Sequence, residues 1–391
     1  MVSVKLLPHG TFGRELILTA LTPLVFSQAL GGTSVEIREY EAVLHGKVGS
    51  LYYVFEAAKN GVTHKNALPK MKPHYNDVQV MTKIKKKLRL NCQDTYVDYG
   101  VALCEWAMND LTRNPQRWEQ SLESIEHTPK TIKLGDVNSV FSGFQPFKIE
   151  KYKYGKQFGN LRAQQDVQMD ERWVALTMAG FLISYSTYSD GEMIFSTVPE
   201  ETLVNAATDF QTINYVQTLT HKLLGPTSIQ KYLNFVYELR SAPDLHHAYS
   251  LLLALHVGKH AKENNLTIAE APPIVFRRVL FSGRSFSLME RISISISSLA
   301  SFVHNLSDDA ANILTDFLRC VLTLYRRENA YCSNRYGDFS VCNKIAKALY
   351  DAVNGSRSPA EVIYLMARSS PENSPLKYTK FLKEVYEAIT G

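Results

Sequence analysis

Residues 172–198 read RWVALTMAGFLISYSTYSDGEMIFSTV, and this stretch decides how the first half of the chain is interpreted. Residues 181–188 and 192–198 are rich in aromatic and β-branched side chains, and they flank Ser189-Asp190-Gly191. The dipeptide Asp-Gly favours the positive φ values that a type I′ turn requires. The stretch therefore predicts an antiparallel β-hairpin.

Upstream of this hairpin, the sequence mixes short strand-like runs with helical patterns. Residues 35–44 partly alternate apolar and polar side chains, and the apolar run 51–55 follows a turn-forming segment, so we expect two paired strands there. Residues 96–111 and 115–125 carry apolar side chains at helical spacing, and Asn114-Pro115 is typical of a helix start. The first two hundred residues thus predict a domain with both strands and helices.

Downstream of residue 201, the pattern changes to one helix after another. Prolines stand where a helix can begin but not continue, as at Ser358-Pro359 and Ser374-Pro375, and Ser307 is placed to cap the helix that follows it. The expected helices cover residues 202–224, 228–240, 244–262, 287–305, 308–327, 340–353, 359–369 and 376–389. We predict an α+β fold in which a mixed α/β N-terminal domain, residues 1–201, is followed by an all-helical C-terminal bundle, residues 202–391.

Composition places the chain among ordinary globular proteins. It has 391 residues, of which 45% are apolar and 21% charged, and this balance disfavours disordered, collagen-like and coiled-coil classes. No apolar run reaches the length of a membrane span, and the N-terminus lacks the pattern of a signal peptide, so we expect a cytoplasmic protein without a membrane partner. The five cysteines are odd in number and include no Cys-x-x-Cys pair, so free and mostly buried thiols are expected.

Positive charge is concentrated in a few segments, although the net charge is only +5. Residues 59–89 hold nine Lys or Arg against the single acid Asp77, and residues 147–158 interleave lysines with Phe and Tyr. Lysine and arginine neutralise phosphates and release counterions, and aromatic rings stack on unpaired bases. The predicted nucleic-acid contacts are Lys65, Lys70, Lys72, Lys83, Lys85, Lys86, Lys87, Arg89, Lys151, Lys153, Lys156, Arg277 and Arg278.

Each cluster also has a structural interpretation. Residues 83–89 can form the solvated face of an amphipathic helix whose Val80, Ile84 and Leu88 turn inward at four-residue spacing. Residues 147–158 can form an exposed hairpin or loop, and the C-terminal arginines can pair with acids of the bundle. In the nucleic-acid interpretation, the basic residues of 83–89 position the DNA backbone and carry no sequence information.

Common catalytic motifs are absent from the sequence. It contains no G-x-x-x-x-G-K-[ST], G-x-G-x-x-G, G-x-S-x-G or H-E-x-x-H pattern, so we expect neither enzymatic activity nor a cofactor. A metal-dependent enzyme built on His246, His247, His256 and His260 is left open, because the last two lie four residues apart on an expected helix. Asp244 is the only carboxylate among them, which favours a structural role for these histidines.

The layout as a whole resembles one protein family. The mixed N-terminal half with a lysine-rich insertion, the segment 172–182 leading into the hairpin, and the closing helical bundle resemble the large subunit of the archaeal subtype I-A CRISPR effector, the Csa-type Cascade large subunit. The resemblance covers nearly the whole chain. It depends on layout and on a diffuse pattern of Trp173 followed by Gly180-Phe181, since this family has no sharp motif.

The resemblance implies a non-catalytic subunit of an RNA-guided antiviral surveillance complex. Its expected partners are guide RNA, target DNA, the other Cascade subunits and a separate helicase-nuclease. The guide RNA reads the target by base pairing, while the protein recognises a short flanking duplex motif, the PAM, and stabilises displaced DNA. The alternative is a nucleic-acid-packaging or ribonucleoprotein scaffold protein unrelated to CRISPR, which mainly self-associates.

Overall fold

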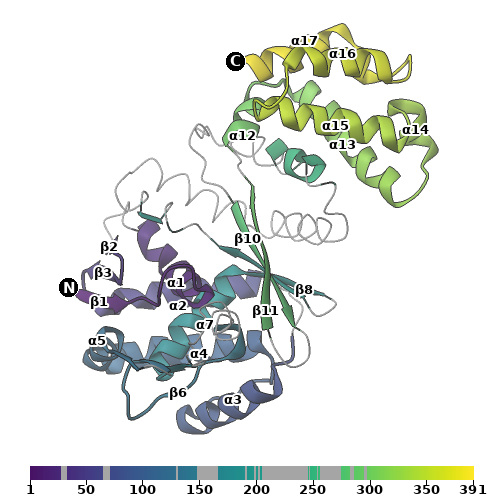
Figure 1. The fold of residues 1–391 in the computed structure, drawn as a ribbon. Helices are drawn as coiled ribbons and strands as arrows, with labels where there is room; N and C mark the ends of the chain where they lie inside the picture. The colour runs from purple at the N-terminus through teal and green to yellow at the C-terminus, as the bar shows by residue number, and fades with distance from the viewer. Residues whose placement is uncertain are drawn as a thin grey trace. The chain divides into compact units, whose positions relative to one another are not determined.

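Helix α7, Glu171–Ser184, forms the centre of the N-terminal unit in the computed structural model (Figure 1). Every α7 side chain except Ile183 is buried, as expected for a helix that is apolar on nearly all sides. Helices α1 (Phe12–Ser27), α2 (Leu51–His64) and α4 (Tyr96–Arg113) pack against it. The stretch 172–182 is therefore the core of this unit.

The structure describes the chain with internal gaps. The described residues are 1–27, 33–64, 71–128, 131–147, 166–189, 192–197, 200, 203–204, 245, 247–252, 254–255, 274–281, 286–294 and 297–391. None of the helices in these ranges is long and apolar enough to span a membrane.

Three small sheets lie in the described part of the N-terminal unit. The first has the order β1-β3-β2 and is antiparallel, with strands Val2–Lys5, Glu41–His45 and Ser34–Ile37. The second has the order β4-β5-β7-β6, with strands Ile125–His127, Thr131–Leu134, Asp166–Met169 and Phe141–Ser142, of which β5 and β7 are parallel. The third has the order β11-β10-β9-β8, with strands Phe286–Ile294, Ile274–Phe281, Glu192–Thr197 and Tyr185–Ser189. The unit also contains the 3-10 turn Val48–Ser50 and the helices α3, Tyr75–Leu88, and α5, Pro115–Glu123.

The β-hairpin predicted from residues 181–198 is confirmed. Strands β8 and β9 pair antiparallel, with Ser189 opposite Glu192 at the turn. Strand β8 begins later than expected, because residues 181–184 still belong to helix α7. The helices predicted over 96–111 and 115–125 are confirmed as α4 and α5.

The strand expected over residues 51–55 is wrong. This run is the first part of helix α2, and the paired strands upstream of it are β2 and β3, which both lie within residues 34–45. The side chains of Leu51, Val54, Phe55 and Ala58 are buried, and this spacing of three and four residues is that of a helix. Tyr52 and Tyr53 are exposed between them, which a strand buried on both faces would not allow.

The C-terminal unit is helical over residues 297–391. Its helices are α12 (Ser297–His304), α13 (Asp308–Arg326), α14 (Ala330–Tyr336), α15 (Phe339–Val353), α16 (Pro359–Ser369) and α17 (Thr379–Thr390), with a 3-10 turn at Pro375–Lys377. The predicted cap is confirmed, since the Ser307 hydroxyl accepts a hydrogen bond from the Ala310 amide at 3.2 Å. Residues 247–252 and 254–255 are also helical, whereas the expected helices over 202–224 and 228–240 lie almost entirely outside the described residues.

The α+β class, with a mixed N-terminal half and a helical C-terminal part, is confirmed, but residues 274–281 and 286–294 are not helical. They form β10 and β11, which complete the sheet begun by β8 and β9, and residues 274–293 belong to the N-terminal unit. The helix expected over 287–305 is therefore wrong in its first half. Residues 292–296 read Ile-Ser-Ile-Ser-Ile, whose period of two is typical of a strand.

The expectation of five free thiols is wrong for two of them. Cys320 on α13 and Cys332 on α14 form a disulfide. Among the other cysteines, Cys104 and Cys342 are buried thiols and Cys92 is half-buried. The odd number of cysteines excluded a fully paired set, but it did not exclude a single bond.

Candidate nucleic-acid interface on helix α3

Helix α3 contains the densest part of the basic cluster, and it is amphipathic. Its buried residues are Asp77, Met81 and Ile84, while Val80 and Leu88 are half-buried. Of the three residues predicted to turn inward, Ile84 is confirmed as buried, whereas Val80 and Leu88 are only half-buried. Because Asp77 is the only acid in residues 59–89, its burial leaves the outer surface of α3 without negative charge.

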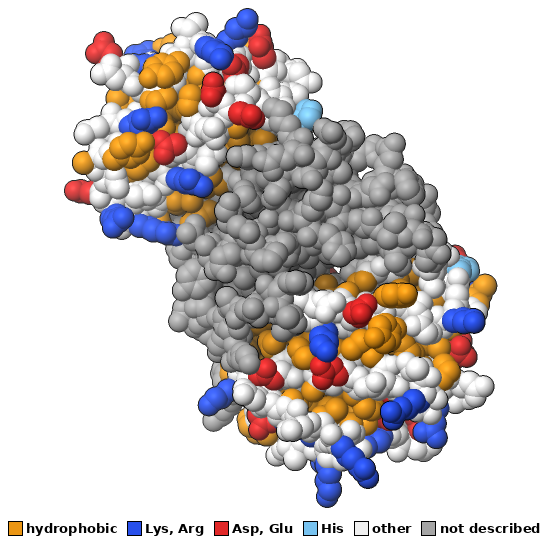
Figure 2. All heavy atoms as spheres, turned by 180° about the vertical axis from the view of Figure 1, so that it is seen from behind, with side chains coloured by type: hydrophobic (Ala, Val, Ile, Leu, Met, Phe, Trp, Pro, Cys, Tyr) orange, Lys and Arg blue, Asp and Glu red, His pale blue; other side chains and the backbone are white. Residues whose placement is uncertain are grey.

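The outer face of α3 combines an aromatic ring with positive charge. Residues spaced by three and four positions share one face of a helix, and the exposed residues at this spacing are Tyr75, Val78, Gln79, Thr82, Lys86 and Arg89. Lys83 lies beside this row and is exposed as well. Helix α3 lies at the lower end of the N-terminal unit in Figure 1, and Lys and Arg side chains project from that end in Figure 2. We call the residues Tyr75, Lys83, Lys86 and Arg89 the α3 face.

A buried carboxylate fixes the first turn of α3 to the domain. Asp77 is 1% exposed, and its carboxylate accepts hydrogen bonds from the Tyr96 hydroxyl at 2.5 Å and from the Gln145 amide at 3.1 Å. The Tyr96 hydroxyl also accepts from the His74 amide at 3.2 Å. Burial, together with the neighbouring Asp77, raises the pKa of Tyr96 well above its usual value, so this hydroxyl keeps its proton as a donor.

Two lysines fix the last turn of α3. Lys85 donates to the Cys92 carbonyl at 2.8 Å and to the Asp94 carboxylate at 2.6 Å. Burial alone would lower the pKa of Lys85, but the interactions with Asp94 and Cys92 together outweigh burial and the pKa is raised. Lys87 donates to Glu171 at 2.8 Å and to the Ser139 hydroxyl, and its ammonium lies 5.2 Å from the centre of the Phe141 ring. These two predicted contacts are therefore engaged within the domain.

The other cations of residues 71–89 are exposed. Lys72, Lys83, Lys86 and Arg89 are exposed, and within the described part of the chain Lys83, Lys86 and Arg89 make no ion pair or side-chain hydrogen bond. Arg89 follows the helix in the left-handed conformation, at φ 57° and ψ 41°, and the Leu90 amide closes the helix end on the Lys85 carbonyl at 3.0 Å. The basic cluster is thus divided into anchoring and outward-facing members.

Arg277 is not available for phosphate contact. Its guanidinium pairs with both carboxylate oxygens of Glu15 on α1, and its side chain is 11% exposed. This pair fixes β10 to the N-terminal helix, so we leave Arg277 out of the interface. Arg278 lies on β10 opposite Ile194. The side chain of Arg278 and the predicted contacts Lys65, Lys70, Lys151, Lys153 and Lys156 lie outside the described residues.

The histidines of the metal hypothesis are mostly outside the described residues. Only His247 is described, and its Nε2 atom lies 2.9 Å from the Asn343 Oδ1 atom in a buried position. In the described ranges, no three His, Cys, Asp or Glu side chains are grouped as metal ligands. The metal hypothesis stays untested at His246, His256 and His260.

Sequence reasoning missed the aromatic end of the α3 face. Tyr75 is 64% exposed, and its ring packs on the ring of His74 with centroids 4.4 Å apart. The sequence did hold a signal for it: Tyr75 lies eleven residues before Lys86, and this spacing of three helical turns places both residues on one face of a helix.

In comparisons with known proteins, no protein-family model and no curated protein matches the chain.

Proposed function

We propose that this protein is a non-catalytic large subunit of an RNA-guided CRISPR surveillance complex, and that the α3 face contacts the phosphate backbone of a nucleic acid. The observation that supports the contact is the outward position of Lys83, Lys86 and Arg89 on a helix whose other lysines are held by the domain. The subunit acts in the cytoplasm with guide RNA, target DNA, the other Cascade subunits and a helicase-nuclease.

The anchoring of α3 explains how this face contributes to binding. Mobile lysines lose rotational freedom when they bind, whereas a helix fixed at both ends by Asp77 and Lys87 presents its charges with its backbone already ordered. Phosphate contacts set the position and orientation of a nucleic acid but carry no sequence information. Other residues therefore read the flanking motif.

The CRISPR assignment is supported by the layout of the chain, a mixed N-terminal half with a lysine-rich helix and a helical C-terminal part. The direct test is to tag the protein in its native host, purify it with its partners and sequence the RNA that accompanies it. Short RNAs with a constant flank and variable interiors are expected. Heterogeneous RNA, or none, would contradict the assignment and favour the packaging or scaffold alternative.

Removing the outward cations of α3 is expected to weaken nucleic-acid binding and its dependence on salt. In the triple variant Lys83→Ala, Lys86→Ala and Arg89→Gly, each lost phosphate contact reduces the slope of log affinity against log salt concentration by about 0.9. Three contacts correspond to a change of about 2.7 in the slope. The measurement is DNA affinity of the purified complex at several salt concentrations.

A matched control separates the α3 face from net charge. Lys47, Lys344 and Lys347 are exposed cations on other elements, and replacing all three with Ala changes the net charge by the same amount. We expect the control variant to keep nearly the whole salt slope. Equal losses in the two variants, or no loss in either, would remove α3 from the interface.

Arg89→Gly alone is expected to weaken binding while it stabilises the N-terminal unit. Arg89 occupies the left-handed region, where glycine avoids the steric cost of a Cβ atom, so we expect a gain of about 0.5–1 kcal/mol. Urea unfolding followed by tryptophan fluorescence measures the gain, because Trp106, Trp118 and Trp173 all lie in the N-terminal unit. A loss of affinity in this more stable variant cannot come from unfolding.

A further inference from the structure

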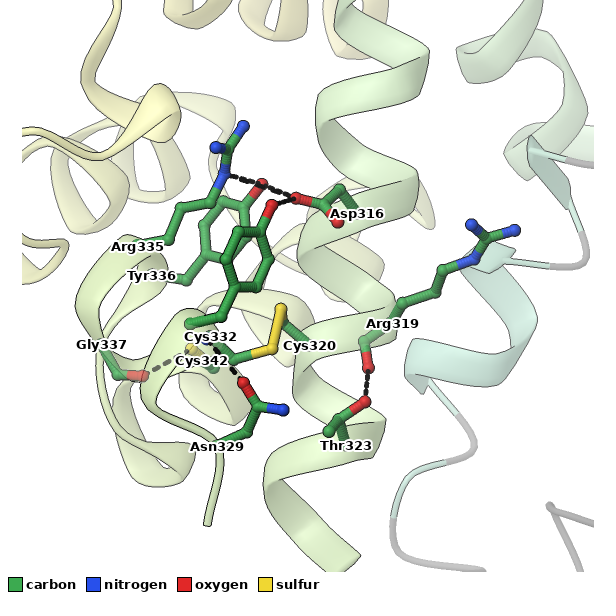
Figure 3. Close-up of a disulfide and its surroundings, with 11 residues drawn as sticks. Asp316, Arg319, Cys320, Thr323, Asn329, Cys332, Arg335, Tyr336, Gly337 and Cys342 are labelled. Atoms are coloured by element: carbon green, nitrogen blue, oxygen red, sulfur yellow. Dashed lines mark hydrogen bonds and ion pairs between the residues drawn. A yellow bond between two sulfur atoms is a disulfide. The ribbon is translucent and has the colours of Figure 1, made fainter. Parts of the chain in front are cut away.

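The disulfide Cys320–Cys332 joins the long helix α13 to the short helix α14 (Figure 3). The bond closes a loop with a sequence separation of 12 residues. Both cysteines are buried, at 3% and 4% exposure. The bond is therefore the covalent part of the contact between these two helices.

A single carboxylate forms the polar part of the same contact. Asp316 lies one turn before Cys320 on α13, and its Oδ2 atom accepts hydrogen bonds from the hydroxyls of Tyr336 at 2.8 Å and Tyr331 at 3.1 Å. The Arg335 Nε atom lies 3.4 Å from the same oxygen. Figure 3 shows Arg335 and Tyr336 directed at Asp316, next to the disulfide. The side chains of Asp316 and Arg335 are 38% and 41% exposed, so water weakens their ion pair.

Helix α14 depends on these tethers because it has only seven residues. An isolated helix of this length is unstable in water. Its local support is the Asn329 cap on the Cys332 amide at 3.0 Å, and its last residue Tyr336 packs on the Phe317 ring with centroids 5.5 Å apart. Without the disulfide, α14 is held by this cap, the ring contact, the half-exposed polar cluster and its packing against α15 and the 3-10 turn Pro375–Lys377.

The nearby free thiol is poorly suited to compete for the disulfide. Cys342 lies in the first turn of α15, and its thiol lies 3.4 Å from the Gly337 carbonyl oxygen at the end of α14. Burial raises the pKa of Cys342 to about 12, which keeps it a thiol, whereas the thiolate is the form that attacks a disulfide. Rearrangement to a bond with Cys342 is thus disfavoured, and the bond Cys320–Cys332 opens chiefly by external reduction.

We propose that Cys320–Cys332 is a reversible oxidation site that controls the attachment of α14 to α13. A thiol reductant of the glutathione or dithiol class opens it: the S–S bond takes up two electrons and two protons to give two thiols, and two reductant thiols become a disulfide. Because both sulfur atoms are buried, the reductant reaches them only when α14 opens transiently, so the local opening of α14 limits the rate. The oxidised form holds α14 in place, and the reduced form lets it separate.

Hydrogen–deuterium exchange of the full chain, with and without a phosphine reductant, tests the control of α14. We expect amides of residues 330–336 to exchange about 100-fold faster after reduction, which corresponds to the loop-closure effect of a disulfide loop of this size. The exchange rates of amides in α4 should not change on reduction. In the double variant Cys320→Ser and Cys332→Ser, these amides are expected to exchange as fast as in the reduced protein, with or without reductant. The variant Cys92→Ser should exchange like the wild type in both conditions.

Rapid alkylation of the protein in its native cells tests reversibility. We expect the fraction of labelled Cys320 and Cys332 to fall after an oxidant pulse and to recover afterwards. Two results overturn the proposal: equal exchange of residues 330–336 in the oxidised and reduced chain, or a labelled fraction that does not respond to oxidant. Neither result bears on nucleic-acid binding by α3, so the two proposals fail independently.

Discussion

Gly180→Ala is expected to prevent the N-terminal unit from folding to a stable state. Gly180 lies in α7 where this helix meets α1, and a Cβ atom there would stand 1.8 Å from the Leu16 carbonyl oxygen and 2.6 Å from the Leu16 carbonyl carbon. Both atoms belong to the backbone, so no side chain can move to make room. We expect a loss of at least about 3 kcal/mol in the free energy of unfolding.

The sign of this effect is informative, because alanine is otherwise the better helix former. In an exposed helix, Gly→Ala stabilises by about 1 kcal/mol. Urea unfolding followed by tryptophan fluorescence measures the difference, with Gly49→Ala as the matched control. An added Cβ at Gly49 meets no atom within 4 Å, and we expect a change within about 0.5 kcal/mol there. Near-native stability of Gly180→Ala would show that α1 and α7 do not approach this closely.

Arg14→Met is expected to lower the free energy of unfolding by about 3–5 kcal/mol, which is the range observed when one partner of a buried ion pair is removed. The Arg14 side chain is 1% exposed. It donates to the carbonyls of Leu7 and Glu39 at 2.9 and 2.8 Å, and to both oxygens of Glu200 at 2.9 and 2.6 Å. Methionine fills similar space but leaves these acceptors without their donor. The same fluorescence assay measures the loss, and Arg113→Ala, at an exposed position, is the control.

The effect of Arg14→Met should depend on pH in a defined direction. Burial tends to raise the pKa of Glu200, but the hydrogen bonds and positive charge of Arg14, together with His9 at 3.6 Å, outweigh burial and the pKa is lowered. A lowered pKa in the folded state stabilises the wild type above the ordinary value of about 4.5, and this stabilisation is lost as the pH falls through the folded-state pKa. Without Arg14, burial raises the pKa of Glu200 instead. The difference between wild type and variant should therefore shrink below pH 4.5, and a difference independent of pH would contradict the pairing.

Local signals were sufficient for elements that begin and end with distinctive residues. Helix α16 begins at Pro359 after Ser358 and ends at Ser369, as predicted, because proline both permits a helix start and prevents an earlier one. The hairpin β8–β9 followed from Asp-Gly between two aromatic runs. The strand prediction for the short apolar run 51–55 was wrong, because a few adjacent apolar residues do not distinguish a strand from a helix.

Long-range pairing is what the sequence did not reveal. Strand β10 pairs with β9 across a long intervening segment, and no local pattern specifies such a partner. Long-range contacts also decide which cations of the candidate site are exposed. The charge cluster on α3 was visible in the sequence, but Lys87 forms its ion pair with Glu171, 84 residues away, and Arg277 forms its ion pair with Glu15. Sequence therefore located the cations, and only tertiary structure separated anchoring residues from outward ones.

The return of β10 and β11 to the N-terminal unit has a consequence for protein synthesis on the ribosome. Strand β9 has β8 on one side from the start, but its other edge has no partner until residues 274–281 have been made. An open edge of this kind is a site for mispairing with other chains. A fragment that ends near residue 201 would keep this edge permanently, so recombinant expression of the N-terminal unit alone should yield aggregates unless residues 274–293 are joined to it.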